Sequence, residues 1–224
     1  MTDLGSLSAS IAACRKCARL VRCREAAAAA PPPRFAGQAY WARPVPGFGD
    51  PAARLLVVGL APAAHGGNRT GRVFTGDRSG DWLYAALHRA GFANQAASVA
   101  RDDGLALTGA YVSCVVRCAP PDNQPSPRER DRCIRYLAEE LALLPRVRAI
   151  VALGGFAWDG VLRAAAARGH AVPRPRPRFG HGAEARVGPW QLVASYHVSQ
   201  QNTFTGRLTE PMLDQVFDRA RAAC

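Results

Sequence analysis

The 224-residue sequence has almost no lysine and no long hydrophobic run. Lys16 is its only lysine, so arginine supplies nearly all of its positive charge. Because no stretch of about 18 consecutive apolar residues occurs, the sequence predicts no membrane-spanning helix. Residues 1–10 also lack the basic start and apolar stretch of a secretory signal. These absences predict a cytoplasmic protein that does not enter a membrane.

The sequence does have a large excess of positive charge. Its 29 basic and 17 acidic residues give a formal net charge of +12. A genome rich in G and C favours arginine codons over lysine codons, but it does not favour basic over acidic residues. The net charge therefore points to a polyanionic partner, and nucleic acid is the partner expected for an arginine-rich surface.

The length fits one domain of residues 1–224, without internal repeats. Four short apolar runs predict strands that are buried on both faces, at 54–59, 110–116, 148–153 and 190–196. Helical stretches lie between or after them, at 80–90, 126–144, 155–168 and 210–222. This alternation predicts an α/β fold, a three-layer αβα arrangement around a central four-stranded parallel sheet.

The remaining segments are predicted to combine helix, loop and a short hairpin. Residues 4–28 are predicted to be helical with a break around Cys14 and Cys17, and residues 31–51 to form an ordered loop rather than a strand. Residues 169–189, rich in Pro, Arg and Gly, are predicted to form a surface loop with a short hairpin.

Ligands of open parallel sheets bind beyond the carboxyl ends of the strands. We therefore expect the active site in the polar segments that follow three strands, at 59–77, 117–127 and 197–209.

Seven cysteines in a cytoplasmic chain favour a metal, cluster or catalytic role over disulfides. Cys14 and Cys17 form a C-x-x-C pair, and Cys118 and Cys133 form a second, wider pair. Four thiolates can hold a [4Fe–4S] cluster or a tetrahedral zinc ion, and the spacing alone does not choose between them. The other three thiols are Cys23 and Cys114, which we interpret as core residues, and Cys224, which has no evident role.

Several segments resemble the family 5 (class B) uracil-DNA glycosylases. They are GLAPAAHGGNRTGRVFTGD at 59–77, YWARPVPGFGD at 40–50, RCAPPDN at 117–123 and HVSQQNTFTGRLT at 197–209. The resemblance implies a single uracil-DNA glycosylase-like domain that removes uracil, and other deaminated bases such as hypoxanthine, from DNA. It also implies a [4Fe–4S] cluster. An N-terminal helical segment of about residues 1–50 would supply some of its ligands. The four ligands would be Cys14, Cys17, Cys118 and Cys133.

The resemblance also implies roles in base excision, which requires that the base leave the stack and enter a pocket. Phe74 would supply the stacking face, whereas a lone Phe is otherwise a core residue. His197 would donate a hydrogen bond to the oxygen on which charge develops. Asp77 would position water or stabilise the sugar cation, although it can equally cap the helix that begins near Ser79. The expected substrate-binding residues are Gly59, Leu60, Ala61, Ala63, His65, Phe74 and Asn123.

Two departures from related families affect how the base is recognised. Leu60 and Ala61 stand where several other families place an acidic or amide residue. Cys114 stands where family 4 enzymes have an asparagine that reads uracil. Asn123 is a substitute reader, although asparagine is also an ordinary turn residue in such a segment. We therefore hypothesise that base choice is relaxed.

The segment after His197 is expected to contact the DNA backbone and to fill the gap left by the flipped base. Because the motifs contain no lysine, a Schiff-base lyase step is not expected, and the enzyme would be a monofunctional glycosylase acting as a monomer. The alternative is a non-catalytic nucleic-acid-binding protein of the same fold with a four-cysteine metal site. The expected DNA-binding residues are Arg69, Arg72, Ser199, Gln200, Gln201, Asn202, Thr203 and Arg207.

Overall fold

The computed structural model describes residues 3–224. Its centre is a sheet with the strand order β1-β3-β2-β4-β6-β5. The four inner strands run parallel, as the sequence predicts. They are β2 (Leu55–Gly59), β3 (Ala110–Cys114), β4 (Ala149–Leu153) and β6 (Trp190–Ser195).

Two short antiparallel strands extend this sheet at its edges. β5 (Glu184–Val187) pairs with β6, so the hairpin expected within residues 169–189 has only its first strand there and its second in β6. β1 (Phe48–Gly49) pairs with β3, so the prediction that residues 31–51 contain no strand is wrong at these two residues. A two-residue strand has no periodicity to detect, because its conformation depends on pairing with β3.

The apolar runs form inner strands because helices cover both faces of the sheet. In β2, Leu55 and Val57 belong to one core cluster, whereas Leu56 and Val58 belong to the other. Side chains alternate between the two faces of a strand, so a strand covered on both sides is apolar at every position. All five residues of β2 are buried.

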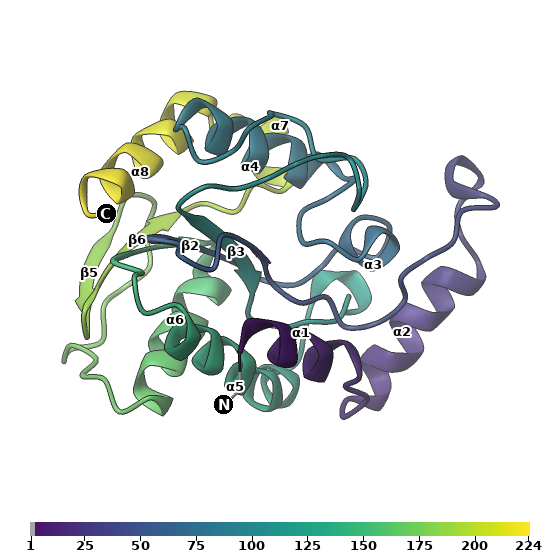
Figure 1. Ribbon diagram of the computed structural model, residues 1–224, viewed down its shortest axis with the longest axis horizontal. Helices are drawn as coiled ribbons and strands as arrows, with labels where there is room; N and C mark the ends of the chain where they lie inside the picture. Colours follow the sequence, from purple (N-terminus) through teal and green to yellow (C-terminus); the bar gives the residue numbers. More distant parts are fainter. Residues whose placement is uncertain (1–2) are drawn as a thin grey trace.

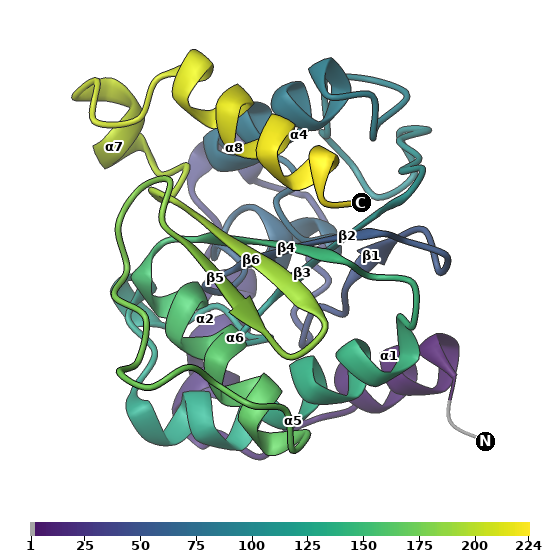
Figure 2. The same ribbon diagram turned by 90° about the vertical axis from the view of Figure 1, so that its left-hand side faces the viewer.

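Helices form the two outer layers, as Figures 1 and 2 show. One layer contains α4 (Arg78–Arg89) and α8 (Glu210–Ala222), and the other contains α1 (Leu4–Ala12), α5 (Pro127–Leu143) and α6 (Gly155–Ala167). The α/β three-layer prediction is therefore confirmed. Ser126 and Glu129 form a capping box at the start of α5, and Thr209 caps α8.

The N-terminal region consists of α1, a turn that contains Cys14 and Cys17, and α2 (Ala18–Ala29). The short helices α3 (Gly67–Thr70) and α7 (Gln200–Phe204) lie in the segments that follow β2 and β6. Single 3₁₀ turns occur at Pro33–Phe35 and Pro121–Asn123. In residues 3–224, no helix combines the length and the apolar character needed to cross a bilayer.

Candidate active site and cysteine pocket

A cleft of about 630 Å³ is lined by the segments that follow β2 and β6. The segment after β3 contributes Asp122 and Asn123. The cleft therefore lies where a parallel sheet places its ligands, beyond the carboxyl ends of the strands. Eleven residues predicted from the sequence to act in catalysis or to bind base or DNA line it: Leu60, Ala61, Ala63, Phe74, Asp77, Asn123, His197, Ser199, Gln200, Gln201 and Asn202.

Phe74 packs between the end of β2 and the ring of His197. Its ring centroid lies 6.3 Å from that of His197, at an interplanar angle of 37°. A Cβ at Gly59 would overlap the Phe74 ring, and a Cβ at Gly80 would overlap the Phe74 carbonyl oxygen. Phe74 itself has a φ of 51°, which is unusual for a residue other than glycine. Gly59 therefore makes room for the Phe74 ring instead of lining the cleft.

Asp77 caps α4, which is one of the two roles considered from the sequence, and it also lines the cleft. Its Oδ1 accepts a 3.0 Å hydrogen bond from the backbone N–H of Gly80. Its Oδ2 faces Gly66, where an added Cβ would overlap the carboxylate. Burial raises the pKa of Asp77, against the lowering effect of the backbone N–H groups. The helix start and Gly66 together fix the carboxylate at the cleft wall.

His197 follows β6 and is electrically neutral at physiological pH. Burial lowers the pKa of its imidazole to about 4. Its carbonyl oxygen accepts a 2.8 Å hydrogen bond from Asn202 Nδ2, which joins His197 to α7. A neutral imidazole has one N–H donor, so it can bind a carbonyl oxygen without contributing a positive charge.

The segment that follows β3 contributes Asp122 and Asn123 to the cleft wall. Both residues have positive φ values, 53° and 56°, and both are exposed. Asparagine and aspartate tolerate this conformation better than most residues. Cys114 does not line the cleft, because it is buried at the end of β3 close to Gly59. The interpretation of Cys114 as a core residue is confirmed.

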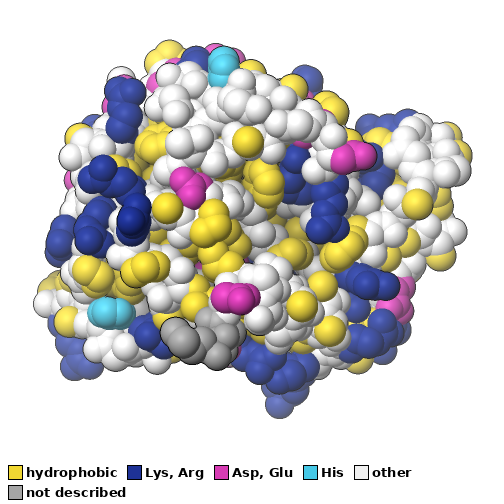
Figure 3. Space-filling view, viewed as in Figure 1, with side chains coloured by type: hydrophobic (Ala, Val, Ile, Leu, Met, Phe, Trp, Pro, Cys, Tyr) yellow, Lys and Arg dark blue, Asp and Glu magenta, His cyan; other side chains and the backbone are white. Residues whose placement is uncertain are grey.

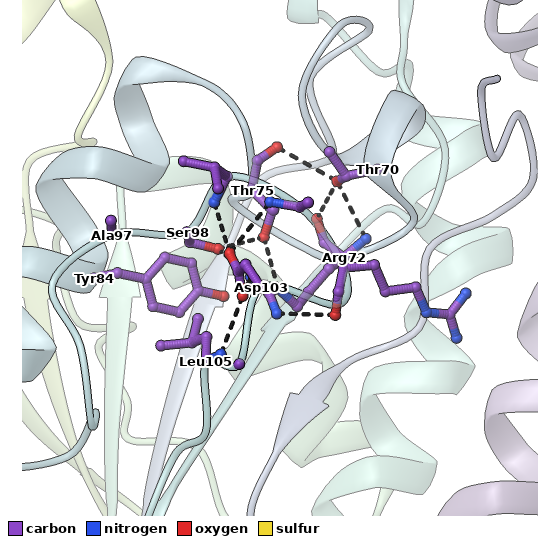
Figure 4. A network of polar contacts seen from close by, with 12 residues as sticks. Thr70, Arg72, Thr75, Tyr84, Ala97, Ser98, Asp103 and Leu105 are labelled. Atoms are coloured by element: carbon purple, nitrogen blue, oxygen red, sulfur yellow. Dashed lines mark hydrogen bonds and ion pairs between the residues drawn. The ribbon is translucent and has the colours of Figure 1, made fainter. Parts of the chain in front are cut away.

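Arg72 does not reach the surface, so its prediction as a phosphate contact is wrong. It is 3% exposed and forms an ion pair of 2.7 Å with Asp103. Ser98 Oγ and Thr75 Oγ1 accept further hydrogen bonds from it, as Figure 4 shows. Burial opposes ionisation of Asp103, but hydrogen bonds from Arg72 and from three backbone N–H groups outweigh it and lower its pKa to about 2. This network holds the chain on both sides of Phe74.

His65 and Arg69 lie outside the cleft lining, in a cluster with the segment before β1. Tyr40 Oη and His65 Nδ1 are hydrogen-bonded at 2.9 Å. The Arg69 guanidinium lies 4.3 Å from the Phe35 ring centroid and donates to Gln38 and to the carbonyl oxygen of His65. The geometry thus gives both residues a role in joining these two segments.

Two further residues predicted to contact DNA also lie outside the cleft lining. Thr203 donates to the carbonyl oxygen of Ser199 within α7. Arg207 is exposed, with its guanidinium 4.6 Å from the ring centroid of Tyr196.

Sequence reasoning missed three lining residues, Arg78, Ser79 and Asp122. Arg78 and Ser79 directly follow Asp77 at the start of α4, so the predicted helix start was a usable signal. Sequence reasoning also did not single out Phe204. Its side chain is 67% exposed, and its ring centroid lies 5.7 Å from Cζ of Arg78. Figure 3 shows basic side chains over several parts of one face, so charge alone does not locate the DNA-binding surface.

Cys14, Cys17, Cys118 and Cys133 line one small pocket of about 20 Å³ between the N-terminal helices and α5. Burial raises the pKa of Cys118 to about 11 and that of Cys133 to about 12. Within residues 3–224, no group of three or more His, Cys, Asp or Glu side chains is arranged to hold a metal ion. The four thiols therefore surround a common space without converging on one point.

Two buried arginines line the same pocket. Arg117 is fully buried and forms a bidentate ion pair with Glu140, which also accepts from Ser113. Arg24 is 1% exposed, and its Nη1 lies 3.1 Å from Cys118 Sγ. The Nε atoms of both arginines have no hydrogen-bond partner among the described residues. Buried polar atoms are rarely left unpaired, so the pocket suits an additional acceptor.

Comparison with known proteins finds uracil-DNA glycosylases both as a family model and as individual relatives. The family model of the uracil DNA glycosylase superfamily matches residues 46–221. The type-5 uracil-DNA glycosylase of Mycobacterium tuberculosis is 55% identical over 217 residues, which cover 96% of this chain and 80% of that relative. The type-5 uracil-DNA glycosylase of Thermus thermophilus is 51% identical over 213 residues, covering 95% and 94% of the two chains.

A type-4 uracil-DNA glycosylase of Archaeoglobus fulgidus is 36% identical over 115 residues, which cover 50% of this chain and 49% of that relative. The similarity to type-5 proteins thus extends over nearly the whole chain, whereas the similarity to this type-4 protein covers half of it. The chain belongs to the uracil DNA glycosylase superfamily, and within it to the type-5 uracil-DNA glycosylases.

Proposed function

We propose that the protein is a monofunctional DNA glycosylase that hydrolyses the N-glycosidic bond of uracil in DNA and leaves an abasic site. The observation that carries this proposal is the meeting of Phe74, Asp77 and His197 in one cleft, in a chain of this family. The three side chains supply an apolar surface, a carboxylate and a neutral hydrogen-bond donor. These are the groups that removal of a flipped base requires.

His197 is the proposed donor to the departing base. When the glycosidic bond breaks, negative charge develops on a carbonyl oxygen of the pyrimidine. A donor aimed at such an oxygen stabilises the transition state by roughly 3–4 kcal/mol. The lowered pKa of His197 keeps the imidazole neutral, so its N–H is already in place at neutral pH and needs no proton from solvent.

Asp77 is the proposed partner of the sugar. Departure of the base leaves positive charge on the deoxyribose, and an ionised carboxylate stabilises that charge or orients the attacking water. The Gly80 N–H holds Oδ1, which fixes the orientation of the carboxylate. Burial raises the pKa of Asp77 above its ordinary value, and the backbone hydrogen bonds of the helix start oppose that shift.

The proposed substrate range includes hypoxanthine and other modified bases as well as uracil. Leu60 and Ala61 line the cleft without polar side chains, and Cys114 is buried away from it. Asn123, which lines the cleft from the segment after β3, is the proposed reader of the base edge. A pocket with few directional contacts discriminates weakly among bases of similar shape. Removal of uracil with no activity on any of a panel of modified bases would contradict this part of the proposal.

DNA is proposed to bind across the mouth of the cleft. Ser199 and Asn202 line it from the start of α7, where backbone N–H groups favour phosphate. Gln200 and Gln201 are exposed on the same helix and are proposed to fill the gap left by the flipped base. Arg69, Thr203 and Arg207 are proposed to contact the flanking backbone, with the protein acting as a monomer.

We also propose that Cys14, Cys17, Cys118 and Cys133 hold a [4Fe–4S] cluster. The four thiols line one pocket, and four thiolates are the ligand set of a [4Fe–4S] cluster. The unpartnered Nε atoms of Arg24 and Arg117 offer donors to an anionic group. The cluster would brace the N-terminal helices against the segment after β3. Iron and zinc analysis of the purified protein tests this, since stoichiometric zinc in a colourless protein would contradict it.

The activity is tested with a uracil-containing oligonucleotide, incubated with the protein and then treated with alkali. Alkali breaks the strand at abasic sites, so the proposal predicts cleavage at the uracil position and none in a matched thymine oligonucleotide. The alternative is a non-catalytic nucleic-acid-binding protein, and a protein that binds DNA but produces no alkali-labile site would support it.

A further inference from the structure

Arg24 differs from the other buried arginines in having no acidic partner. Arg72 is paired with Asp103, and Arg117 is paired with Glu140. Arg24 is equally buried, yet no ion pair joins it to a carboxylate in residues 3–224. A buried guanidinium without an opposite charge is strongly destabilising, so this position requires an anion from another source.

The groups that face Arg24 identify that anion. Its Nη1 lies 3.1 Å from Cys118 Sγ and 3.4 Å from the carbonyl oxygen of Cys14. Its Nε is buried without a partner, in a side chain that lines the pocket of the four cysteines. The guanidinium therefore contacts the Cys118 sulfur through Nη1, while its Nε is left without a partner.

We propose that Arg24 is the internal counter-ion of the four-cysteine group and sets its electron affinity and its resistance to oxidative loss. The inference rests on the cluster proposed above. Four thiolates around a [4Fe–4S] core make a group of net negative charge, and each added electron increases that charge. A fixed guanidinium within hydrogen-bond distance stabilises the more negative states, so it raises the reduction potential.

The backbone of Arg24 extends this role toward the active site. Its carbonyl oxygen accepts a 3.1 Å hydrogen bond from Nδ2 of Asn68, a buried residue of α3. The backbone N–H of Ala42 donates to the carbonyl oxygen of Asn68. Arg24, which contacts the Cys118 sulfur, is thus hydrogen-bonded directly to the segment between β2 and Asp77. Loss of the group held by Arg24 would loosen this attachment.

The test replaces Arg24 with methionine, which has an apolar side chain and no charge. R22M is the matched control, because Arg22 lies on the same helix with an exposed side chain. Proteins are purified anaerobically, and three quantities are measured: iron per chain, the rate of iron loss in air, and the reduction potential by voltammetry. None of these depends on glycosylase activity. R24K restores the charge, and R24Q replaces R24M if the methionine variant does not fold.

We expect R24M to lose iron about tenfold faster than wild type, as for other changes beside metal ligands, and to have a lower reduction potential. R24K should have a potential between those of wild type and R24M, and R22M should match wild type in every measurement. An R24M protein with the potential and iron-loss rate of an iron-loaded wild type would overturn this inference alone. Wild-type protein purified without iron would overturn both the inference and the cluster proposal.

Discussion

The cleft and the cysteine pocket differ in how far the protein satisfies its own buried groups. In the cleft region, Asp77 accepts from the start of α4, and the neighbouring Arg72 is paired with Asp103. In the cysteine pocket, Arg24 has no carboxylate partner, and the Nε of Arg117 is unpaired. The cleft is also far larger, about 630 Å³ against about 20 Å³.

This difference indicates two kinds of ligand. A site that is complete without its ligand suits a substrate that binds and leaves, because the folded protein must persist between turnovers. A small site with unpaired buried groups suits a resident group, because the fold is satisfied only when that group is bound. The predictions below separate the two sites, beginning with the largest effect.

Removal of one pocket thiol should abolish binding of the resident group. We expect C118S to contain at least about tenfold less iron per chain than wild type and to melt at a lower temperature. C23S is the control, since Cys23 is half-buried but does not line the pocket. Metal analysis and thermal unfolding provide the measurements, and wild-type iron content in C118S would exclude Cys118 as a ligand.

Changes in the cleft should affect chemistry without removing iron. We expect H197A to excise uracil a few hundred-fold more slowly in single turnover, because it lacks the donor to the developing oxyanion. DNA affinity and iron content should stay close to wild type, since the lost interaction forms mainly in the transition state. Unchanged single-turnover excision by H197A would remove His197 from the mechanism.

Asp77 has a capping and a proposed chemical role, and one substitution separates them. Asparagine is as good a helix cap as aspartate, so D77N should change the free energy of unfolding by only a few tenths of a kcal/mol. Its excision rate should fall about 100-fold, because the amide has no charge. D77A should lose the cap as well, at a further cost of about 1 kcal/mol. Wild-type excision by D77N, measured beside urea unfolding, would show that Asp77 is a cap only.

The neutral state of His197 predicts a pH effect on stability. Its pKa is about 4 in the folded protein, below the value of about 6.5 expected when unfolded. The unfolded state therefore binds the proton first, and stability is lost as the pH falls from about 6.5 toward 4. Between pH 7 and pH 5 this amounts to about 2 kcal/mol. Urea unfolding should show this loss of unfolding free energy in wild type but not in H197A. Equal losses in both proteins would contradict the lowered pKa of His197.

The sequence predicted the inner sheet well, because its signal is local. A continuous apolar run such as residues 55–59 indicates a strand covered on both faces, whatever lies next to it. β1 was not predicted, because a strand of two residues is too short to form an apolar run. The helices predicted at 126–144 and 210–222 also begin close to their observed starts, where capping depends on residues a few positions apart.

The arginines were the least predictable residues, because their roles depend on distant partners. Arg72 and Arg24 look alike in sequence, yet Arg72 meets Asp103, and Arg24 meets Cys118, 94 positions away. His65 and Arg69 stand in the first motif but face the segment around Phe35 and Tyr40. A linear motif shows which residues lie near a site, but the fold decides which of them face it.

The central claim is that the cleft around Phe74, Asp77 and His197 removes uracil by hydrolysis alone. It is tested most directly by incubating the protein with DNA that contains labelled uracil and analysing the products before any alkali is added. The account predicts free uracil in solution and an unbroken strand in the same reaction. DNA that is bound without release of uracil, or a strand that breaks before alkali treatment, would contradict it.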